Sequence, residues 1–264
     1  MIADLQIHSV FSSYSLYLRN SEIMRKLRLK YKDSEFFDRK NLWWVEDVLI
    51  DGISTPEQIL KTAKSKGLGA VAITDHNTTI GNLEAQLLSK KYGVLVIPAM
   101  EVSTLDGEIL AYGIKNKIPF RLTAEESINE IHRQGGVAVA AHPFNPKHKN
   151  QDFARIDEEK IMTLDLDGLE VASPIFGIQD RWRVLAKKMG VAMTAGSDAH
   201  TPALIGSVWT EFDNNCNTVE KIINAIKNHQ TEVGYNPKRF SLFVKTATEY
   251  FWGNTLGRPF IKVI

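Results

Sequence analysis

Val71-Ala72-Ile73-Thr74-Asp75-His76-Asn77-Thr78 is the stretch that decides the fold. Its apolar and β-branched start predicts a short buried strand from Ala70 to Thr74. An aspartate and a histidine follow at once, at the carboxyl end of that strand. In parallel α/β folds this edge carries the functional residues. The stretch therefore predicts an α/β barrel or sheet that gathers such strand ends around metal ions.

The rest of the chain repeats this pattern of strands and helices. Strands are predicted at 2–7, 94–101, 108–114, 137–141, 168–171 and 191–195, and helices at 54–67, 82–92, 123–134, 179–189 and 218–228. Thr123-Ala124-Glu125-Glu126 is typical of a capping box at a helix start, and Gly135-Gly136 follows the end of that helix. Strands that alternate with helices indicate parallel βαβ units, closed or nearly closed into a barrel.

Composition favours one globular unit. A length of 264 residues suits a single α/β barrel, and 44% hydrophobic with 24% charged residues is typical of a soluble protein. The net charge of +1 provides no bulk attraction to nucleic acid or to an anionic membrane. The lone cysteine, Cys216, excludes an intrachain disulfide and a cysteine-rich zinc site, which fits a reducing cytoplasm. No apolar run is long enough to span a bilayer, and the first predicted strand begins too early to leave room for a signal peptide.

Two segments depart from the alternation. Residues 10–50 are charged and aromatic and too long for a βα loop, so we interpret them as an insertion. They predict either a helical excursion packed on the barrel rim or a lid over the substrate. In residues 235–264, apolar spacing between Lys238 and Phe251 predicts a helical extension docked on the barrel, or a subunit contact. The expected organisation is a barrel over 1–234, with this insertion, and an extension over 235–264.

Histidines and carboxylates collect at predicted strand ends. At or just past such an end lie His8, His76, Glu101, His142, Asp198 and His200. Taken singly, each is more often a satisfied core or surface residue than a ligand. Together they are expected to meet on one face, because strand carboxyl ends converge there in a barrel. Imidazoles and carboxylates crowded in this way need cations, and nitrogen and oxygen donors without thiolate suit zinc, manganese or iron.

Five short motifs at these positions resemble those of the PHP (polymerase and histidinol phosphatase) family of metal-dependent phosphoesterases. They are Asp4-Leu5-Gln6-Ile7-His8-Ser9, Ala72-Ile73-Thr74-Asp75-His76-Asn77-Thr78, Glu101-Val102-Ser103 with Glu108-Ile109-Leu110-Ala111-Tyr112-Gly113, Ala141-His142-Pro143 and Gly196-Ser197-Asp198-Ala199-His200. All five occur in the family's order over most of residues 2–233. The resemblance implies a distorted (β/α)7 barrel, which agrees with the alternation of strands and helices.

Three positions depart from the family pattern. Gln6 stands where the family has the first histidine of the first motif, and Glu108 stands where it has a histidine in the third. The family's acidic residue after the first motif aligns directly with Ser13. An alternative alignment, which we prefer, places Asp51 there, displaced by the insertion. With that alignment every family ligand position carries a donor atom.

The resemblance implies two or three divalent ions. The ligand sets carry over residue by residue as Gln6, His8, Glu101 and Asp198 for the first ion, Glu101, Glu108 and His142 for the second, and Asp51, His76 and His200 for the third. The position of Gln6 is expected to be the weakest, because a neutral amide oxygen binds a cation less tightly than an imidazole. Asp4 and Asp75 are expected to orient neighbouring imidazoles or to cap loops.

The activity implied is metal-dependent hydrolysis of a small phosphorylated metabolite, such as a nucleotide, sugar or amino-alcohol phosphate, by an activated hydroxide. The residues expected to be catalytic are His8, His76, Asp198 and His200. Four basic residues on the rim loops are candidate phosphate contacts, although a solvated basic loop is the simpler interpretation of each. They are Lys147, His148, Arg181 and Arg183.

Two other functions remain open. A nuclease of the same family would use the same cluster, but the near-neutral charge and the lack of a basic stripe argue against it. A barrel with altered ligands could instead be a binding or regulatory module without turnover. Salt-dependent DNA binding separates the nuclease from the metabolite hydrolase, and metal content with an assay of turnover identifies the module.

Overall fold

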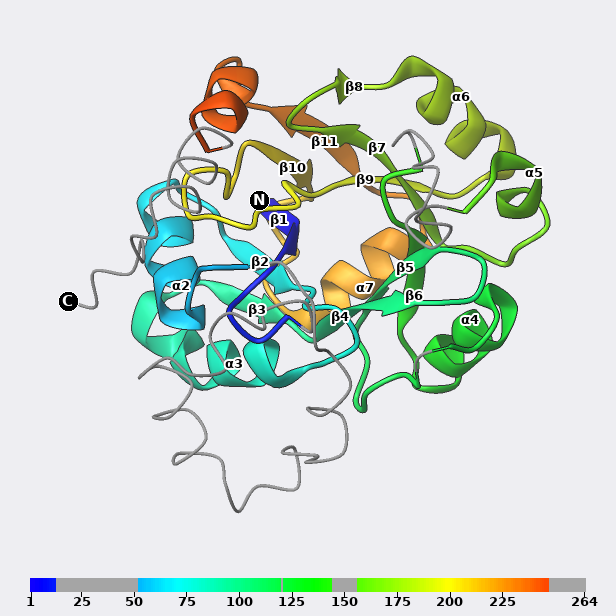
Figure 1. The fold of residues 1–264 in the computed structure, drawn as a ribbon, viewed down its shortest axis with the longest axis horizontal. Helices are drawn as coiled ribbons and strands as arrows, with labels where there is room; N and C mark the ends of the chain where they lie inside the picture. The colour runs from blue at the N-terminus through cyan, green and yellow to red at the C-terminus, as the bar shows by residue number, and fades with distance from the viewer. Residues whose placement is uncertain (13–51, 120, 144–155, 247–264) are drawn as a thin grey trace, which may run out of the picture.

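The strands and helices of the computed structural model follow the predicted alternation (Figure 1). The structure describes residues 1–12, 52–119, 121–143 and 156–246. The strands are β1 (Ile2–Ile7), β2 (Ala70–Ile73), β3 (Leu95–Ile97), β4 (Ala99–Ser103), β5 (Glu108–Tyr112), β6 (Val137–Ala140), β7 (Gly168–Ser173), β8 (Gly177–Ile178), β9 (Ala192–Ala195), β10 (Val208–Glu211) and β11 (Glu232–Tyr235). The helices are α2 (Pro56–Ser65), α3 (Ile80–Tyr92), α4 (Ala124–Arg133), α5 (Glu158–Ile161), α6 (Asp180–Met189) and α7 (Val219–Lys227). The predicted strand 94–101 is split into β3 and β4 at Pro98, which has no amide hydrogen for a ladder.

The described strands form two mixed sheets. One has the order β11-β10-β1-β2-β3, and the other has the order β4-β5-β6-β7-β8, with β9 also paired to β7. The expectation of parallel βαβ units holds for β1 to β3 and for β6, β7 and β9. It is wrong for β5, which runs antiparallel to both β4 and β6, because the tight Asp106-Gly107 turn reverses the chain without a helix. The fold is therefore mixed α/β, and the strand pairing seen in the described residues does not close it into a barrel.

The carboxyl ends of the parallel strands lie at one edge, where isolated backbone bridges connect the sheets. Ile7 pairs with Ala199, and His76 pairs with Glu101. Because β5 runs in the opposite direction, its first residue, Glu108, lies beside Ser103 at the end of β4. The antiparallel strand thus presents its amino end at the edge where the parallel strands present their carboxyl ends.

Helices bury apolar faces against these sheets. α7 lies near the centre of the view in Figure 1, and its Ile222 and Ile226 are fully buried in a core shared with Leu5 of β1 and Val139 of β6. Each such side chain stabilises the fold by about 2 kcal/mol relative to an exposed one. The predicted capping box at Thr123 is confirmed: its hydroxyl accepts from the Glu126 amide, and the Glu126 carboxylate accepts from the Thr123 amide. Because the core around α7 contains residues of β1 and β6, α7 packs against both of the sheets that carry the strand-end residues.

The proposed insertion and extension are described only in part. Residues 13–51, which hold most of the insertion, lie outside the described residues. Beyond β11 the chain is helical from residue 239 to 246, and Leu242 and Phe243 pack against a core that includes Ile73. In the described ranges, every helix is too short or too polar to cross a bilayer.

The ion pair between His132 and Asp167 is expected to make stability depend on pH. His132 Nε2 lies 2.7 Å from Asp167 Oδ2, and that hydrogen bond raises the pKa of His132 although partial burial opposes it. Because the folded-state pKa is raised, the stabilisation is complete below the unfolded-state pKa and is lost as the pH rises through the folded-state pKa. We expect about 1 kcal/mol from this partly exposed pair. Urea unfolding at pH 5.5 and pH 9 should show a smaller wild-type advantage over His132→Gln at the higher pH, and an equal advantage at both would contradict the assignment.

Candidate metal centre

The predicted strand-end residues meet in one cluster. β1 carries Gln6 and leads into His8, and β2 leads into His76. The remaining members come from the other sheet: Glu101 in β4, Glu108 at the start of β5, His142 after β6, and Asp198 and His200 after β9. The folded chain therefore brings together residues that are separated by almost 200 positions.

Glu101 lies at the centre of the cluster and is fully buried. Its Oε2 atom is 3.1 Å from His8 Nε2 and 3.8 Å from His76 Nδ1. Its Oε1 atom is 3.2 Å from His142 Nε2. A carboxylate that contacts three imidazoles through both oxygens has the geometry needed to bridge two cations.

The open side of the cluster is formed by Asp198 and His200. Their side chains are 36% and 32% exposed, whereas His8 is buried. His8 Nε2 is 3.2 Å from Asp198 Oδ1, and the His8 ring stacks on His76 and on His200 with centroid distances of 4.8 and 4.6 Å. A substrate that enters from solvent would meet Asp198 and His200 first.

Glu108 completes the cluster opposite this opening. Its Oε1 lies 3.4 Å from His76 Nδ1, and its Oε2 lies 3.5 Å from His142 Nε2. Three groups of side chains each offer donor atoms that lie within 4.8 Å of one another. They are His8, His76 and Glu101; His8, Asp198 and His200; and Glu101, Glu108 and His142. The last set matches the second ion implied by the family resemblance. His76 and His200, which the resemblance assigned to one ion, fall in different sets among the described residues.

Gln6 faces the same carboxylate. Its Nε2 donates to both oxygens of Glu101, at 3.3 and 3.4 Å. A half turn of the amide would present its oxygen instead. Gln6 can thus serve as a hydrogen-bond donor to Glu101 or as a weak neutral ligand.

Two ligand-bearing turns have unusual backbone conformations. His142 has φ 27° and Asp198 has φ 48°, both in the left-handed region that non-glycine residues rarely adopt. Such a conformation costs about 1–3 kcal/mol and persists only where surrounding contacts impose it. Strain of this kind clusters at functional sites, and here it falls on two side chains of the cluster.

Two buried aspartates hold other turns of the site. Asp4 accepts from the amide and hydroxyl of Ser197, next to Asp198, and its pKa is raised to about 6 by burial against these opposing hydrogen bonds. Asp75 accepts from the amide and hydroxyl of Ser9, next to His8. Both contacts agree with the expectation that these aspartates cap loops around the ligands.

Glu170 is a site residue that the sequence analysis missed. It lies in β7, is 1% exposed, and its Oε2 accepts from the His142 amide at 2.8 Å. Burial, opposed by His142, raises the pKa of Glu170 to about 8. The sequence feature that could have identified Glu170 as a site residue is its carboxylate, which lies between Leu169 and Val171 in a strand otherwise made of apolar and small residues.

The electrostatics of the cluster show how crowded its charges are. Burial raises the pKa of Glu101, but His76, His142 and His8 hold it well below its ordinary value. Burial and repulsion from Glu101 raise the pKa of Glu108 well above its ordinary value. Burial lowers the pKa of His142, but its hydrogen bond to Glu101 and the nearby acidic groups raise that pKa to about 10. The raised pKa values of Glu108 and His142 favour bound protons, which offset negative charge that divalent cations would otherwise offset. Cation uptake is therefore expected to release protons.

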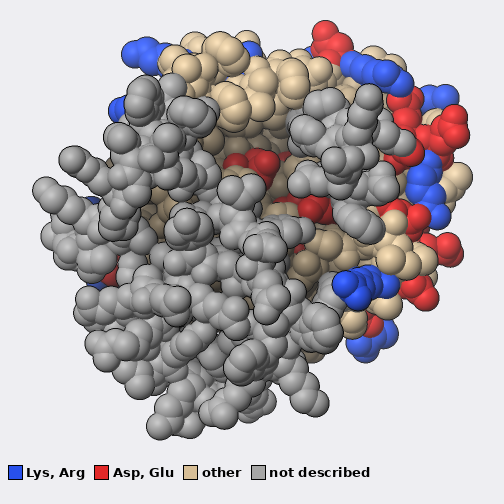
Figure 2. Space-filling view, in the orientation of Figure 1, with Lys and Arg blue, Asp and Glu red and all other residues tan. Residues whose placement is uncertain are grey.

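The donor set fits divalent cations. Among the described residues, the ion pairs of Glu101, Glu108 and Asp198 are all with histidines. Figure 2 shows acidic atoms in a hollow near the centre of this face, whereas most visible lysine and arginine atoms of the described residues lie toward its margins. Several carboxylates and imidazoles whose ion pairs, within the described part of the chain, are all with one another are the chemistry that divalent ions with nitrogen and oxygen ligands satisfy.

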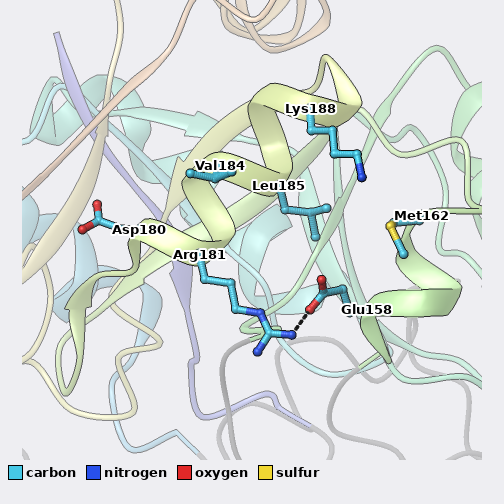
Figure 3. Close-up of a pocket in the computed structure, with 7 residues that line it drawn as sticks. All are labelled: Glu158, Met162, Asp180, Arg181, Val184, Leu185 and Lys188. Atoms are coloured by element: carbon cyan, nitrogen blue, oxygen red, sulfur yellow. Dashed lines mark hydrogen bonds and ion pairs between the residues drawn. The ribbon is translucent and has the colours of Figure 1, made fainter.

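The candidate phosphate contacts are not part of this cluster as described. Arg181 pairs with Glu158 and lines a surface pocket of about 380 Å³ between α5 and α6, where Figure 3 shows its guanidinium turned to the Glu158 carboxylate. Arg183 pairs with Asp180 at 3.3 Å. Their role in substrate binding stays a prediction. Asp51, Lys147 and His148 lie outside the described residues.

Comparison with known sequences gives a family and two relatives. A family model described as PHP-associated matches residues 180–231. An uncharacterised protein of Methanocaldococcus jannaschii is 36% identical over 171 residues, which are 65% of this chain and 81% of that protein. A phosphoribosyl 1,2-cyclic phosphate 1,2-diphosphodiesterase of Eggerthella lenta is 36% identical over 81 residues, which are 28% of this chain and 31% of that enzyme.

Solved structures of low sequence identity share the fold. A two-domain protein of Bacteroides vulgatus that contains a predicted PHP-like metal-dependent phosphoesterase aligns with a TM-score of 0.63 at 15% identity, over 93% of this chain and 69% of that one. A lesion-specific endonuclease Q of Pyrococcus furiosus aligns with a TM-score of 0.53 at 18% identity, over 90% of this chain and 59% of that one. At these identities the likeness concerns the fold alone.

Proposed function

This chain belongs to the PHP family of metal-dependent phosphoesterases, and on that premise we propose that it hydrolyses a phosphate ester in a small phosphorylated metabolite. The observation that carries the proposal is Glu101, a buried carboxylate in contact with three histidines next to the partly exposed Asp198 and His200. The substrates we expect are nucleotide, sugar or amino-alcohol phosphates. The name of the Eggerthella lenta relative, which acts on a phosphoribosyl compound, supports a small substrate.

We propose two or three manganese, zinc or iron ions as the cofactors. Glu101, Glu108 and His142 would hold one ion, and His8, Glu101 and Asp198, with Gln6 as the weak member, would hold another. The resemblance would place His76 and His200 on a third ion together with Asp51, although the two histidines fall in different donor sets among the described residues. Asp51 precedes Gly52, whose Cα faces the His8 backbone, and the Ile53 amide donates to the His200 carbonyl. The preference for Asp51 over Ser13 as the acidic ligand rests on the sequence alignment, because Ser12, next to Ser13, also contacts His8 and His76.

Each part of the site has a role in such a hydrolysis. When bound, divalent ions neutralise charge that develops on the phosphoryl oxygens and favour deprotonation of the attacking water. Asp198 and His200, at the open side, would hold their cations where an entering phosphate ester can reach them. The buried members, Glu101 and His142, would keep the donor atoms fixed during turnover.

The nuclease alternative stays open, because a lesion-specific endonuclease shares this fold. The net charge of +1 opposes it, because binding to a duplex depends on neutralising several phosphates. A metal-binding module without turnover is the other alternative, since Gln6 is a weak ligand. The seven-unit barrel, the division into 1–234 and 235–264, and a cytoplasmic location are further proposals that rest on the sequence patterns.

A substrate panel tests the proposal. Phosphorylated metabolites and an abasic DNA duplex would be assayed with manganese, zinc or iron, with His8→Ala and His200→Ala as controls and with metal content measured in parallel. We expect release of phosphate from a small metabolite and a loss of about 10²–10³-fold in both variants. Activity that survives both changes would show that the site is elsewhere. Cleavage of DNA alone would favour the nuclease, and fewer than one bound ion per chain without turnover would favour the module.

A further inference from the structure

We infer that Glu170 is a positioning residue for the metal centre, which holds the backbone of His142 so that the imidazole faces Glu101 and Glu108. The inference rests on the proposed function only in that it takes His142 as a ligand. Glu170 lies outside the three donor sets of the described cluster, so its effect would pass through His142.

The contact between the two residues is short and fully enclosed. Glu170 Oε2 accepts the His142 N–H at 2.8 Å, and both residues are buried. β6 and β7 are parallel neighbours in which Ala140 pairs with Leu169. This register places the residue after Leu169 beside the turn that follows β6. The hydrogen bond therefore fixes the peptide group that leads into His142.

His142 needs such a restraint because its backbone is strained. Its φ of 27° lies outside the extended values of the strand that precedes it. From this conformation its Nε2 lies 3.2 Å from Glu101 and 3.5 Å from Glu108. Release of the amide would let the turn relax toward a commoner conformation and move the imidazole away from both carboxylates.

The other carboxylate oxygen of Glu170 argues against a role in stability alone. Oε1 is buried, and it has no hydrogen-bond partner in the part of the chain that the structure describes. A buried carboxylate with one unpartnered oxygen is costly, and a leucine of similar size would avoid that cost. Leu169 and Val171 point to the opposite face of β7, so the described neighbours of Glu170 are its cross-strand partner Thr194 and the His142 turn. Glu170 thus improves the geometry of the site at a cost to stability, which is common at functional positions.

Metal binding and stability, measured separately, test the inference. The variants are Glu170→Leu, which removes the acceptor, and Glu170→Gln, whose amide oxygen can accept the same N–H. Thr194→Val is the matched control, because Thr194 is the buried cross-strand partner of Glu170 and donates to Leu169 rather than to a ligand. Binding of Mn²⁺ is measured by calorimetry, the visible spectrum is recorded with Co²⁺ bound, and thermal unfolding is followed without metal.

We expect Glu170→Leu to weaken Mn²⁺ binding by about 10–100-fold and to change the Co²⁺ spectrum, as loss of a residue that orients a ligand does. The metal-free variant should unfold near the wild-type temperature, because loss of the unpartnered Oε1 offsets the cost of leaving the His142 N–H without its acceptor. Glu170→Gln should stay within about threefold of wild type, because it restores the acceptor. Thr194→Val should bind like wild type.

Several outcomes would overturn the inference. Wild-type affinity and spectrum in Glu170→Leu would do so, as would a loss in Glu170→Gln as large as that in Glu170→Leu. If Glu170→Leu does not fold, Glu170→Met replaces it under the same criteria, and failure of both to fold would show a structural role. None of these readouts needs a substrate, so wild-type protein that binds cations but hydrolyses nothing would contradict the proposed function alone.

Discussion

Exchange of Glu101 for glutamine is expected to lower turnover by roughly a thousandfold, the upper end for removal of one strong electrostatic group from an active site. The physical reason is that Glu101 belongs to two of the three donor sets and contacts His8, His76 and His142. Glutamine keeps the shape of the side chain but removes the charge and one oxygen. One carboxylate change therefore affects two cation positions at once.

Activity and metal content of the same samples check this expectation. Glu101→Gln should retain at most one bound ion in elemental analysis after manganese loading, in parallel with its loss of turnover. Glu57→Gln is a suitable control, because Glu57 is a surface carboxylate paired with Lys91 and lies away from the cluster. Full metal content with activity within threefold of wild type would show that Glu101 is not a shared ligand.

Alanine at position 196 is expected to destabilise the protein by about 3 kcal/mol, as severe overpacking of a core does. A Cβ atom on Gly196 would lie 2.4 Å from both the Cβ and the backbone nitrogen of Gln6. Neither atom is the end of a flexible side chain, so the two segments would have to separate. That movement would also displace Asp198 from His8, because Asp198 follows two residues later.

Urea unfolding of the metal-free protein measures this cost. Gly67→Ala is the control: a Cβ there meets nothing within 4 Å, but the φ of 76° is unfavourable for alanine, at a cost of about 1 kcal/mol. Gly196 does not have a positive φ, so a cost well above that of Gly67→Ala would come from the steric contact and not from the backbone conformation. Equal costs would mean that the β1 edge and the turn after β9 are less tightly packed than described.

The sequence alone predicted most elements of the fold and most residues of the cluster, but not α5, β8, β10, β11 or Glu170. The alternation of strands and helices, the capping box at Thr123 and the strand ends at His76 and His142 follow from local preferences and periodicity, which act over a few residues. The short motifs likewise identified which side chains could donate to a cation. Gln6 and Glu108 could be identified as departures from the family motifs without a structure, because the residue type at a motif position is read directly from the sequence.

Only the tertiary structure decided how those residues are paired. The division of His76 and His200 between two donor sets and the contact from Glu170 to the His142 amide depend on residues distant in sequence. Arg181 acquired its partner Glu158 on α5 for the same reason, whereas Arg183 pairs locally with Asp180, three residues earlier on α6. Local propensity does not predict such contacts, because the free energy that selects them comes from packing and desolvation after the strands have assembled.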